Sequence, residues 1–332
     1  MKIIFLENSI LPYSGADKNN SFLRGAELAI INLSEELASR GHYIKVFNNC
    51  SKNQIVNNVD YQNINQIHQK VECDIAVVNA DANLFKHVKS SKNFLFSHSV
   101  QNFEKFIRKK QLLAFIKYKP IVLCCGKYHY DNRSFFTSFY GKKIITPSID
   151  DEFFYTELPR KINSDIIFYS RADRNGQLVI DIWKDLFKKF QLSQNLFIST
   201  DFEITDQEMI SYNIKRMKYL KKKDLINLLK NFRLLIIPGH KGETFCNVAE
   251  EAKALGIPIV TLGYGALSER VQNNYNGFLC TDIKDFKSKI YELLTNDVLY
   301  LKFKNNLIKD RGMIKWSDTV NTLIKLFNKI YD

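Results

Sequence analysis

The sequence predicts an α/β protein made of two doubly wound halves, each a parallel sheet with helical crossovers. Three observations support this fold class. Short runs rich in Ile, Val and Phe alternate with segments of helical periodicity along most of the 332 residues. The alternation breaks once, at residues 147–151, which read Pro-Ser-Ile-Asp-Asp, and then begins again. Residues 234–260 also form a complete strand–helix–strand pattern, with a glycine at the expected end of the helix.

The N-terminal half begins with a short apolar strand, a polar loop over residues 8–24 and a helix over residues 25–38. Apolar side chains recur at helical spacing in that helix, which begins with a glycine. Strands of this half are expected at residues 2–6, 43–47, 74–78, 93–96, 121–125 and 143–145. Segments long enough for a helix separate most of them, which favours a parallel sheet.

The C-terminal half repeats this order, so both halves are predicted to be Rossmann-like domains. Its strands are expected at residues 165–169, 195–199, 214–217, 234–237 and 257–260, and its first helices at residues 178–190 and 223–231. The tail, residues 316–331, has the apolar spacing of an amphipathic helix and no strand after it. We therefore expect the tail to pack on a structure that is already formed.

Residues 234–260 contain the most informative site pattern. Asn247 is a good N-cap residue, and Glu250 three positions later is expected to complete a capping box. Glu243 then lies in the loop at the carboxyl end of a strand, and Glu251 lies in the first turns of the helix, where open α/β sheets bind ligands. The N–H groups of residues 245–248, together with the helix dipole, favour an anion such as a pyrophosphate.

The amino-acid composition indicates which classes of protein this chain fits. Hydrophobic residues make up 45% and charged residues 25% of the chain, as in soluble globular proteins, and no apolar run is long enough to span a membrane. The start of the chain does not read as a signal peptide, so a cytoplasmic protein is expected. The six cysteines and six histidines lack metal-ligand spacing, so no metal site is expected. The net charge of +13 would attract anions, although a general compositional bias explains it equally well.

With these features side by side, the chain resembles a retaining glycosyltransferase of family 4 with the GT-B fold. The main resemblance is the Glu-x7-Glu motif, which here comprises Glu243, Glu251, Ala252, Ala254, Gly256 and Pro258. Residues 265–271, 276–279, 24–27, 40–46 and 96–98 are also similar to the family pattern. The resemblance implies two Rossmann-like domains that face each other across a cleft, at residues 1–147 and 148–315. It also implies that the helix of residues 316–332 crosses back to the first domain.

The resemblance implies that a sugar moves from a nucleotide diphosphate sugar to an acceptor, with retained anomeric configuration and with neither cofactor nor metal. Glu243 would bind hydroxyls of the donor sugar and Glu251 the ribose. The diphosphate would lie on backbone amides near Gly25 and Ala26 and of the segment Thr244, Phe245, Cys246 and Asn247. Arg171 would neutralise the leaving diphosphate, and His98 would line the cleft.

One position departs from the family pattern, which has a lysine about five residues after the arginine. This chain has Arg174 instead, closer to Arg171 than that lysine would be. Either Arg174 takes the role of that lysine or the second positive charge is absent. The second alternative leaves open a nucleotide-sugar-binding protein without turnover, and a nucleotide-sugar epimerase of the same fold is a further alternative. No nucleic-acid-binding motif accompanies the positive charge, so no nucleic-acid partner is expected.

Residues 103–119 combine basic and aromatic residues in an amphipathic pattern. Such a stretch can lie on an anionic membrane surface, or it can simply bury one apolar face and expose its lysines. The first alternative would place the protein peripherally on the inner face of the cytoplasmic membrane. It suits a saccharide or lipid-linked acceptor, which the family resemblance associates with cell-envelope polysaccharide or lipopolysaccharide synthesis.

Overall fold

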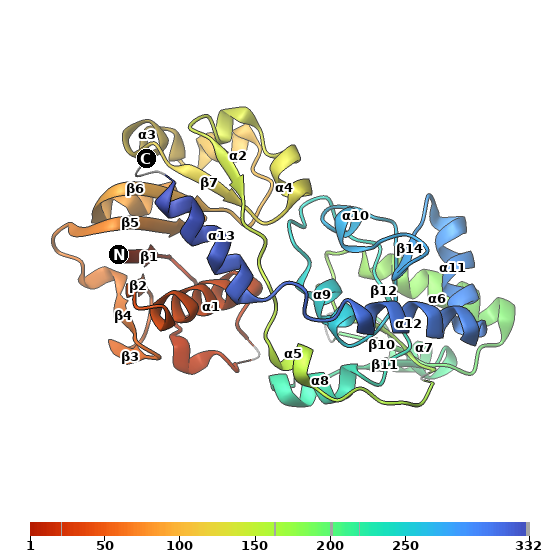
Figure 1. Cartoon of the computed structure of the whole chain (residues 1–332). Helices are drawn as coiled ribbons and strands as arrows, with labels where there is room; N and C mark the ends of the chain where they lie inside the picture. Colours follow the sequence, from red (N-terminus) through yellow and green to blue (C-terminus); the bar gives the residue numbers. More distant parts are fainter. Residues whose placement is uncertain (21, 163, 200–201, 219, 330–332) are drawn as a thin grey trace. The chain divides into compact units, whose positions relative to one another are not determined.

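The structure, a computed structural model, describes residues 1–20, 22–162, 164–199, 202–218 and 220–329. It divides into two compact units, each with its own sheet (Figure 1). The first unit comprises Met1–Ser148 together with Ile314–Asp332, and the second comprises Ile149–Met313. The predicted tail helix extends to residue 331, and its residues 330 and 331 lie outside the described part of the chain.

The first unit is built on an eight-stranded sheet with the order β3-β4-β2-β1-β5-β6-β7-β8. Neighbouring strands are parallel except β3 and β4, which form a hairpin. The strands are β1 (Lys2–Leu6), β2 (Tyr43–Asn48), β3 (Gln54–Val56), β4 (Val59–Asn63), β5 (Val71–Asn79), β6 (Val88–Phe96), β7 (Ile121–Cys124) and β8 (Lys142–Ile144). All six strands predicted for this half are present.

The β3–β4 hairpin is an element that the sequence pattern did not reveal. Its two-residue turn is Asn57-Asn58, and both residues have positive φ, 49° and 62°. Two central residues with positive φ are the signature of a type I′ turn, for which asparagine is a favoured residue. The hairpin extends the sheet edge beyond the parallel strands that hydrophobic runs reveal.

Helices cover both faces of this sheet. On one face, α13 (Trp316–Asn328) packs against α1 (Gly25–Ser39), and the ring of Phe327 lies 5.0 Å from that of Phe94. On the other face, η3 (Ala82–His87), α2 (Phe103–Arg108) and α3 (Gln111–Tyr118) contribute Phe85, Phe106 and Phe115 to a core with strand residues such as Leu95. Further short helices are η1 (Gly15–Asp17), η2 (Ile64–Gln66), α4 (Lys127–Asn132) and η4 (Phe135–Thr137).

The second unit has a fully parallel six-stranded sheet with the order β11-β10-β9-β12-β13-β14. The strands are β9 (Ile166–Phe168), β10 (Leu196–Ile198), β11 (Ile214–Arg216), β12 (Leu234–Ile236), β13 (Ile259–Thr261) and β14 (Gly277–Leu279). The helices are α5 (Glu152–Tyr155), α6 (Gly176–Phe190), α7 (Asp206–Ser211), α8 (Lys222–Leu229), α9 (Asn247–Ala254), α10 (Leu267–Arg270), α11 (Ile283–Thr295) and α12 (Asp297–Lys309). The predicted α/β class is therefore confirmed, with each predicted strand of this half in place.

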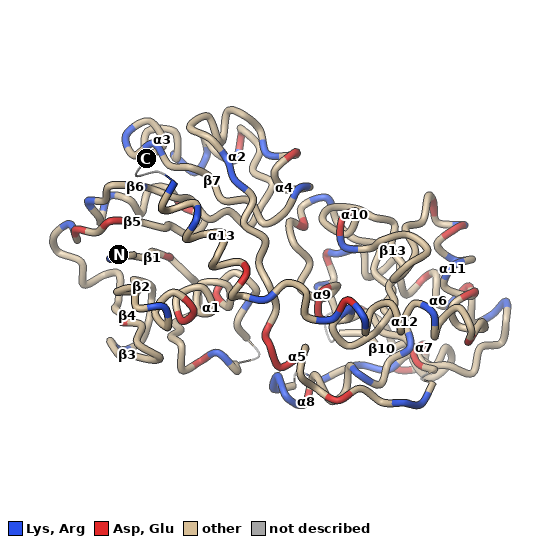
Figure 2. The backbone as a smooth tube through the Cα atoms, viewed as in Figure 1, with Lys and Arg blue, Asp and Glu red and all other residues tan. Residues whose placement is uncertain are grey.

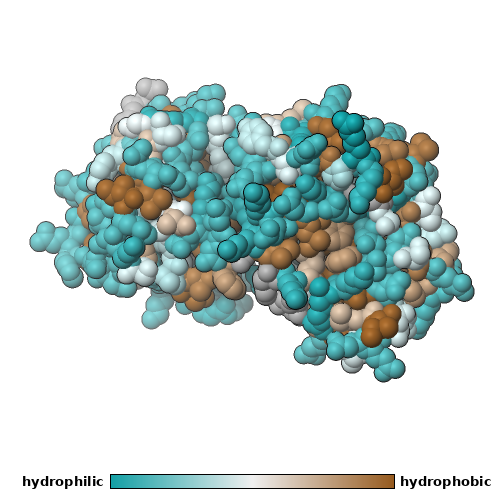
Figure 3. Space-filling model, turned by 90° about the horizontal axis from the view of Figure 1, so that it is seen from below, coloured by the Kyte–Doolittle hydropathy of each residue, from teal (hydrophilic) through white to brown (hydrophobic). Residues whose placement is uncertain are grey.

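The surface carries the charge that the composition predicts. Lysine and arginine residues are distributed along the backbone of both units rather than gathered in one stretch (Figure 2). On the face that Figure 3 shows, apolar residues occur as separate patches in a mainly hydrophilic surface. Among the described residues, no helix combines the length and the apolar character needed to cross a membrane.

Candidate functional site

The loop that carries Glu243 connects β12 to α9 at the carboxyl end of the sheet. Two glycines fix its course. Gly239 has φ +92°, and a Cβ atom there would lie 2.6 Å from the carbonyl oxygen of Tyr264. Gly265 has φ +70°, and its Cβ would lie 2.3 Å from the carbonyl oxygen of His240. The two backbone segments can approach this closely only because both positions lack a side chain, and the N–H of Ala266 then donates to the carbonyl of Glu243 at 3.0 Å.

Glu243 presents an unsatisfied carboxylate oxygen. Its Oε2 is buried and has no hydrogen-bond partner within the described part of the chain. Burial raises the pKa of Glu243, while nearby Arg174, a contact with Cys246 and nearby His240 oppose the shift. A buried acceptor without a donor is costly unless something supplies one. The geometry therefore suits a ligand that brings hydroxyl groups to this carboxylate.

His240 connects this loop to the segment that follows β9. Its Nδ1 accepts hydrogen bonds from Arg174 Nη1 at 2.7 Å and from the Gly242 N–H at 3.0 Å. Because Nδ1 accepts, the imidazole carries its proton on Nε2. The side chain of Asn175 adds a second connection, donating to the carbonyl of Gly239 at 2.6 Å. Neither His240 nor this connection was identified from the sequence.

The two arginines that the sequence singles out lie in different surroundings. Arg171 is exposed and pairs with Asp173 at 2.8 Å, a surface ion pair of the kind that contributes little to stability. Arg174 is half-buried, bonds His240 and acts electrostatically on Glu243. The arginine beside the central glutamate in the second unit is thus Arg174.

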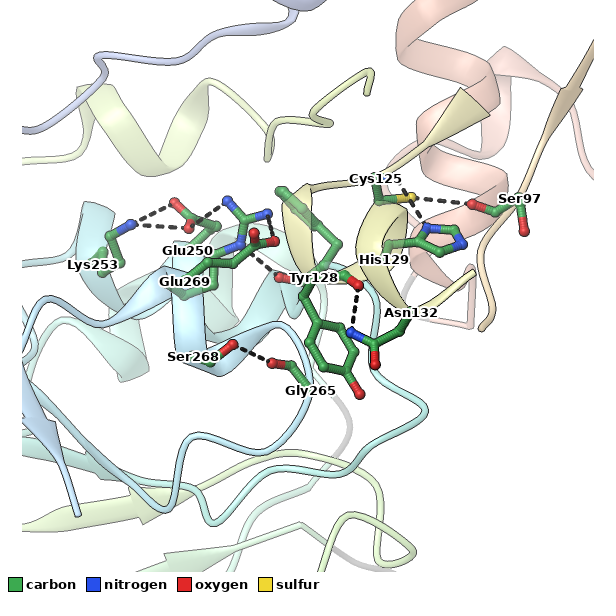
Figure 4. Close-up of polar contacts among 12 residues, drawn as sticks. Ser97, Cys125, Tyr128, His129, Asn132, Glu250, Lys253, Gly265, Ser268 and Glu269 are labelled. Atoms are coloured by element: carbon green, nitrogen blue, oxygen red, sulfur yellow. Dashed lines mark hydrogen bonds and ion pairs between the residues drawn. The ribbon is translucent and has the colours of Figure 1, made fainter. Parts of the chain in front are cut away.

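The predicted N-cap of α9 is wrong by one residue. Cys246 occupies the N-cap position, with φ +67°, and α9 begins at Asn247 without a side-chain cap. The carbonyl of Cys246 accepts from the N–H groups of Ala249 and Glu250 at 3.2 and 3.4 Å. The expected capping box is absent because the carboxylate of Glu250 faces cations instead. It lies 2.9 Å from Lys253 (Figure 4) and 3.6 Å from Arg270. Gly256, with φ +68°, does terminate the helix as predicted.

Arg270 holds the segment that enters α9. Its Nε donates to the carbonyl of Phe245 at 3.1 Å, and its guanidinium lies 4.6 Å from the centre of the Phe245 ring. Thr244, Phe245 and Cys246 are consequently buried with their backbone fixed at the start of the helix. By the geometry of any helix, the N–H groups that precede the first intrahelical bond at the start of α9 lack intrahelical partners, and they carry the positive end of its dipole.

Glu251 lies in the second turn of α9 and contacts Tyr169, which follows β9. The Tyr169 Oη is 2.9 Å from Glu251 Oε2 and 3.1 Å from the carbonyl oxygen of Val248. Burial raises the pKa of Glu251 to about 7, and the bond from Tyr169 opposes that shift. Tyr169 ends a predicted strand at the ligand edge, which is the signal that could have identified it.

In the first unit, the predicted residues follow strands of one sheet. Gly25 and Ala26 are the first residues of α1, after β1, and the N-cap residue Arg24 makes no side-chain cap but pairs with the buried Glu27. His98 follows β6, with its ring 4.3 Å from that of Phe96 and its Nδ1 3.9 Å from Cys125 Sγ. Burial lowers the pKa of His98 to about 4, so the imidazole is neutral at physiological pH.

In the first unit, Gly25 and Ala26 follow β1 and His98 follows β6, and β5 lies between these two strands in the sheet. The predicted residues of the second unit follow neighbouring strands. Arg174, Glu243, residues 244–247 and Glu251 lie at the carboxyl side of the neighbouring strands β9 and β12. Within the described residues, no cluster of His, Cys, Asp and Glu side chains could hold a metal ion.

Comparison with known proteins gives the fold and the type of the second unit. Residues 165–310 match the model of the family described as glycosyl transferases group 1. The second unit carries a group 1 glycosyltransferase domain. A curated relative, an uncharacterized glycosyltransferase of Methanocaldococcus jannaschii, is 24% identical over 160 residues, which are 47% of this chain. The match spans 44% of that relative, less than half of its length.

Solved structures extend the likeness to the whole chain. Sucrose-phosphate synthase from Thermosynechococcus elongatus is similar with a TM-score of 0.73 and 14% identity, covering 100% of this chain and 99% of that one. HepE from Anabaena, in complex with UDP, gives a TM-score of 0.72 and 16% identity over 99% and 100% of the two chains. WaaG, a glycosyltransferase involved in lipopolysaccharide biosynthesis, gives 0.69 and 13% over 98% and 99%. At these identities the likeness concerns the fold, which is GT-B.

Proposed function

We propose that this protein is a retaining glycosyltransferase of family 4 that transfers a sugar from a nucleotide diphosphate sugar without a metal ion. One observation carries the proposal. In the segment that matches group 1 glycosyltransferases, Glu243 keeps a buried oxygen without a donor from the described residues, beside Arg174 and the start of α9. A donor sugar would supply the missing hydroxyl group, and its diphosphate would supply the anion for the arginine and the helix.

Each part of the donor has a matching group in the second unit. The ribose hydroxyls would donate to Glu251, whose other contact is Tyr169. The diphosphate would bind the backbone N–H groups of Thr244 to Asn247, where the chain enters α9, together with Arg174. A hydroxyl of the sugar would donate to Glu243 Oε2. HepE has been solved with UDP-glucose, which supports a uridine diphosphate sugar as the first donor to test.

The proposed catalysis is electrostatic. As the bond between sugar and phosphate breaks, negative charge develops on the departing diphosphate, and preorganised cations and N–H groups stabilise it there. Arg174 is already oriented by its bond to His240, so little reorganisation is needed when charge develops. Arg171 lies three residues earlier, and its solvent-exposed guanidinium would add a second positive charge. These groups would replace the divalent ion that other nucleotide-sugar enzymes use.

We further propose that the first unit binds the acceptor near His98, whereas the backbone amides near Gly25 and Ala26, at the start of α1, would contact the diphosphate. A neutral imidazole can accept a hydrogen bond from a sugar hydroxyl, which suits a saccharide acceptor. WaaG, which shares the fold, is involved in lipopolysaccharide biosynthesis, and this supports an acceptor of the bacterial envelope. The acceptor would then be a saccharide or a lipid-linked saccharide.

A basic and aromatic patch on the first unit supports peripheral contact with an anionic membrane. It comprises the exposed apolar residues Phe103, Ile107, Phe135 and Phe136, and the neighbouring cations Lys105, Arg108, Lys109 and Lys110. The rings of Phe103 and Phe136 are 5.7 Å apart, which joins α2 to η4. Exposed apolar side chains accompanied by lysine and arginine are typical of surfaces that enter the headgroup region. Flotation with vesicles containing phosphatidylserine, compared with phosphatidylcholine alone, tests this contact through the variant F135S/F136S.

A two-step experiment tests the proposed function. A thermal-shift screen with UDP, GDP and their sugars identifies the donor, since binding to the folded state raises the melting temperature. Release of nucleotide diphosphate is then measured with and without membrane extract as acceptor. We expect acceptor-dependent release without added metal and in the presence of a chelator. Binding without release would favour a nucleotide-sugar-binding protein, and conversion of the donor sugar without acceptor would favour an epimerase.

A further inference from the structure

The loop that carries His98, residues 97–101, is held in place by two side chains of α4 and its C-cap. This loop leaves β6 at the carboxyl edge of the sheet and ends at the start of α2. His129 of α4 and Arg133 one turn later both reach it, because residues four apart lie on the same face of a helix. We name His129 and Arg133 together the α4 clamp.

Arg133 makes the larger number of contacts. Its Nη1 donates to Ser97 Oγ at 2.6 Å and approaches the carbonyl of Ser99 at 3.4 Å. Its Nη2 donates to Gln101 Oε1 at 3.3 Å and to the carbonyl of Thr137 at 3.0 Å. One guanidinium thus joins three residues of the loop to η4. The rigid fork of donors on arginine suits this task, which a lysine ammonium cannot reproduce.

The position of this guanidinium is energetically unusual. Arg133 is 2% exposed, and the four acceptors that contact it are a hydroxyl, an amide and backbone carbonyls, none of them ionised. Its Nε is buried and has no partner among the described residues, and burial lowers the pKa of Arg133 to about 10. A buried charge without a counter-charge costs free energy that a neutral side chain would not. The need to place the loop of residues 97–101 explains a buried arginine at this position better than a contribution to folding stability does.

His129 adds a second, neutral attachment. Its Nδ1 accepts from the N–H of Cys125 at 3.1 Å, so the proton lies on Nε2, which donates to the carbonyl of Ser99 at 3.0 Å. The Sγ of Cys125 donates to the carbonyl of Ser97 at 3.3 Å, and Figure 4 shows the contacts of Cys125 with both Ser97 and His129. Ser97 and Ser99, the residues on both sides of His98, are therefore both held by hydrogen bonds from Cys125 and the α4 clamp.

We propose that the α4 clamp sets the position of His98, so that Arg133 and His129 are positioning residues for sugar transfer on the acceptor side. The inference that they serve transfer depends on the proposed function, whereas the existence of the clamp does not. The hydrogen bonds of the clamp join residues of the first unit, and they involve neither Gly25 and Ala26 nor the proposed donor groups of the second unit. Removing one bond of the clamp should therefore leave UDP binding unchanged.

The experiment compares Arg133→Lys with a matched control, Arg233→Lys, in the full chain. Arg233 is 3% exposed and donates to the carbonyl of Leu293 at 2.7 Å, but it lies in the second unit away from the proposed site. Hydrogen exchange of a peptide covering residues 97–101 and the ring resonances of His98, assigned with His98→Gln, report the loop directly. We expect at least tenfold faster exchange and a shifted His98 resonance in Arg133→Lys, and neither in Arg233→Lys. Unchanged exchange and an unchanged resonance in Arg133→Lys would overturn the clamp.

Turnover with the donor identified by the screen then tests positioning. We expect Arg133→Lys and His129→Leu to reduce transfer at least tenfold while the Kd for UDP stays within twofold. His129→Gln, which keeps a donor near Nε2, should recover most of that loss. A loosened loop with normal transfer would overturn the positioning role while leaving the clamp in place. Absence of turnover in the wild type would count against the proposed function, and the exchange data would still decide the clamp. If Arg133→Lys does not fold, Ser97→Ala removes a single bond and serves the same comparison.

Discussion

Arg174 and His240 lie 2.7 Å apart, Nη1 to Nδ1, and this contact joins the segments that follow β9 and β12. Because the imidazole accepts here, it orients the guanidinium without competing for a negative ligand. Arg174 also acts on Glu243, whereas Arg171 is occupied with Asp173 at the surface. The pair therefore places an oriented cation next to the proposed sugar-binding carboxylate.

The first prediction separates the two arginines. Arg174→Ala should lower turnover at least a hundredfold, on the order of 3 kcal/mol of transition-state stabilisation, because it removes the oriented charge. Arg171→Ala should lower turnover only a few-fold, because that side chain is solvated. Steady-state kinetics with chelator present measure both. A larger loss in Arg171→Ala than in Arg174→Ala would reverse the assignment.

The second prediction concerns Glu251 and the pH dependence of donor binding. Burial raises the pKa of Glu251 to about 7 in the free protein, and ribose hydroxyls need the ionised form as acceptor. Affinity for UDP should therefore decrease as pH falls below about 7, by up to tenfold per pH unit. Calorimetric titration between pH 5.5 and 8 measures this change and the accompanying proton release. In Glu251→Gln the pH dependence should disappear, and its persistence would show that another group is responsible.

The third prediction concerns Glu7, which follows β1 and accepts hydrogen bonds from Tyr13 and, at 2.5 Å, from Asn79 Nδ2. Burial raises the pKa of Glu7 from 4.5 to about 7, so the folded protein binds this proton more tightly than the unfolded chain. This tighter proton binding adds to the free energy of unfolding. The added stability is fully present below pH 4.5 and is lost as pH rises through about 7. Glu7→Gln should therefore raise the melting temperature at pH 8 relative to the wild type and flatten its decline between pH 5 and 8. The exposed Glu104→Gln is the control and should show no such change.

The fourth prediction uses two glycines with similar backbone angles. Gly41 has φ +81° and open space around it, so Gly41→Ala should cost only backbone strain, about 1–2 kcal/mol. Gly265, at φ +70°, would place a Cβ 2.3 Å from the carbonyl of His240, so Gly265→Ala must also displace the loop that carries Glu243. We expect Gly265→Ala to lose more stability and at least tenfold in UDP affinity, with UDP affinity unchanged in Gly41→Ala. Denaturant unfolding and calorimetry provide the two measurements, and equal UDP affinities would contradict the role given to this contact.

Hydrophobic runs in the sequence predicted most of the fold because both sheets are buried on both faces. The strands at residues 234–237 and 257–260 are clear for this reason, and the structure pairs β12 with β13 in parallel. The β3–β4 hairpin was missed because its two asparagines, rather than an apolar pattern, determine the turn. Regular periodicity reports burial, whereas such turns depend on single residues that tolerate positive φ.

Residues of the candidate site could be predicted from the sequence where they lie next to the end of a buried strand. Glu243 and Glu251 stand out as carboxylates beside buried strands, but the N-cap at Cys246 does not, because cysteine is not a usual residue at positive φ. The proposed role of Arg174 in place of Arg171 depends on the position of His240, which is 66 residues away from Arg174 in the chain. The same is true of the α4 clamp, whose contacts with residues 97–101 join residues 30 to 36 positions apart.

Glu243→Gln is the decisive variant for the proposed donor site, because the amide keeps the size of the side chain and removes its charge. The measurement is the rate of acceptor-dependent sugar transfer at saturating donor, together with the Kd for UDP. We predict a loss of at least a hundredfold in transfer, with the Kd for UDP within threefold of the wild type and an unchanged melting temperature. Transfer within fivefold of the wild-type rate would contradict the assignment of Glu243 as the residue that holds the donor sugar.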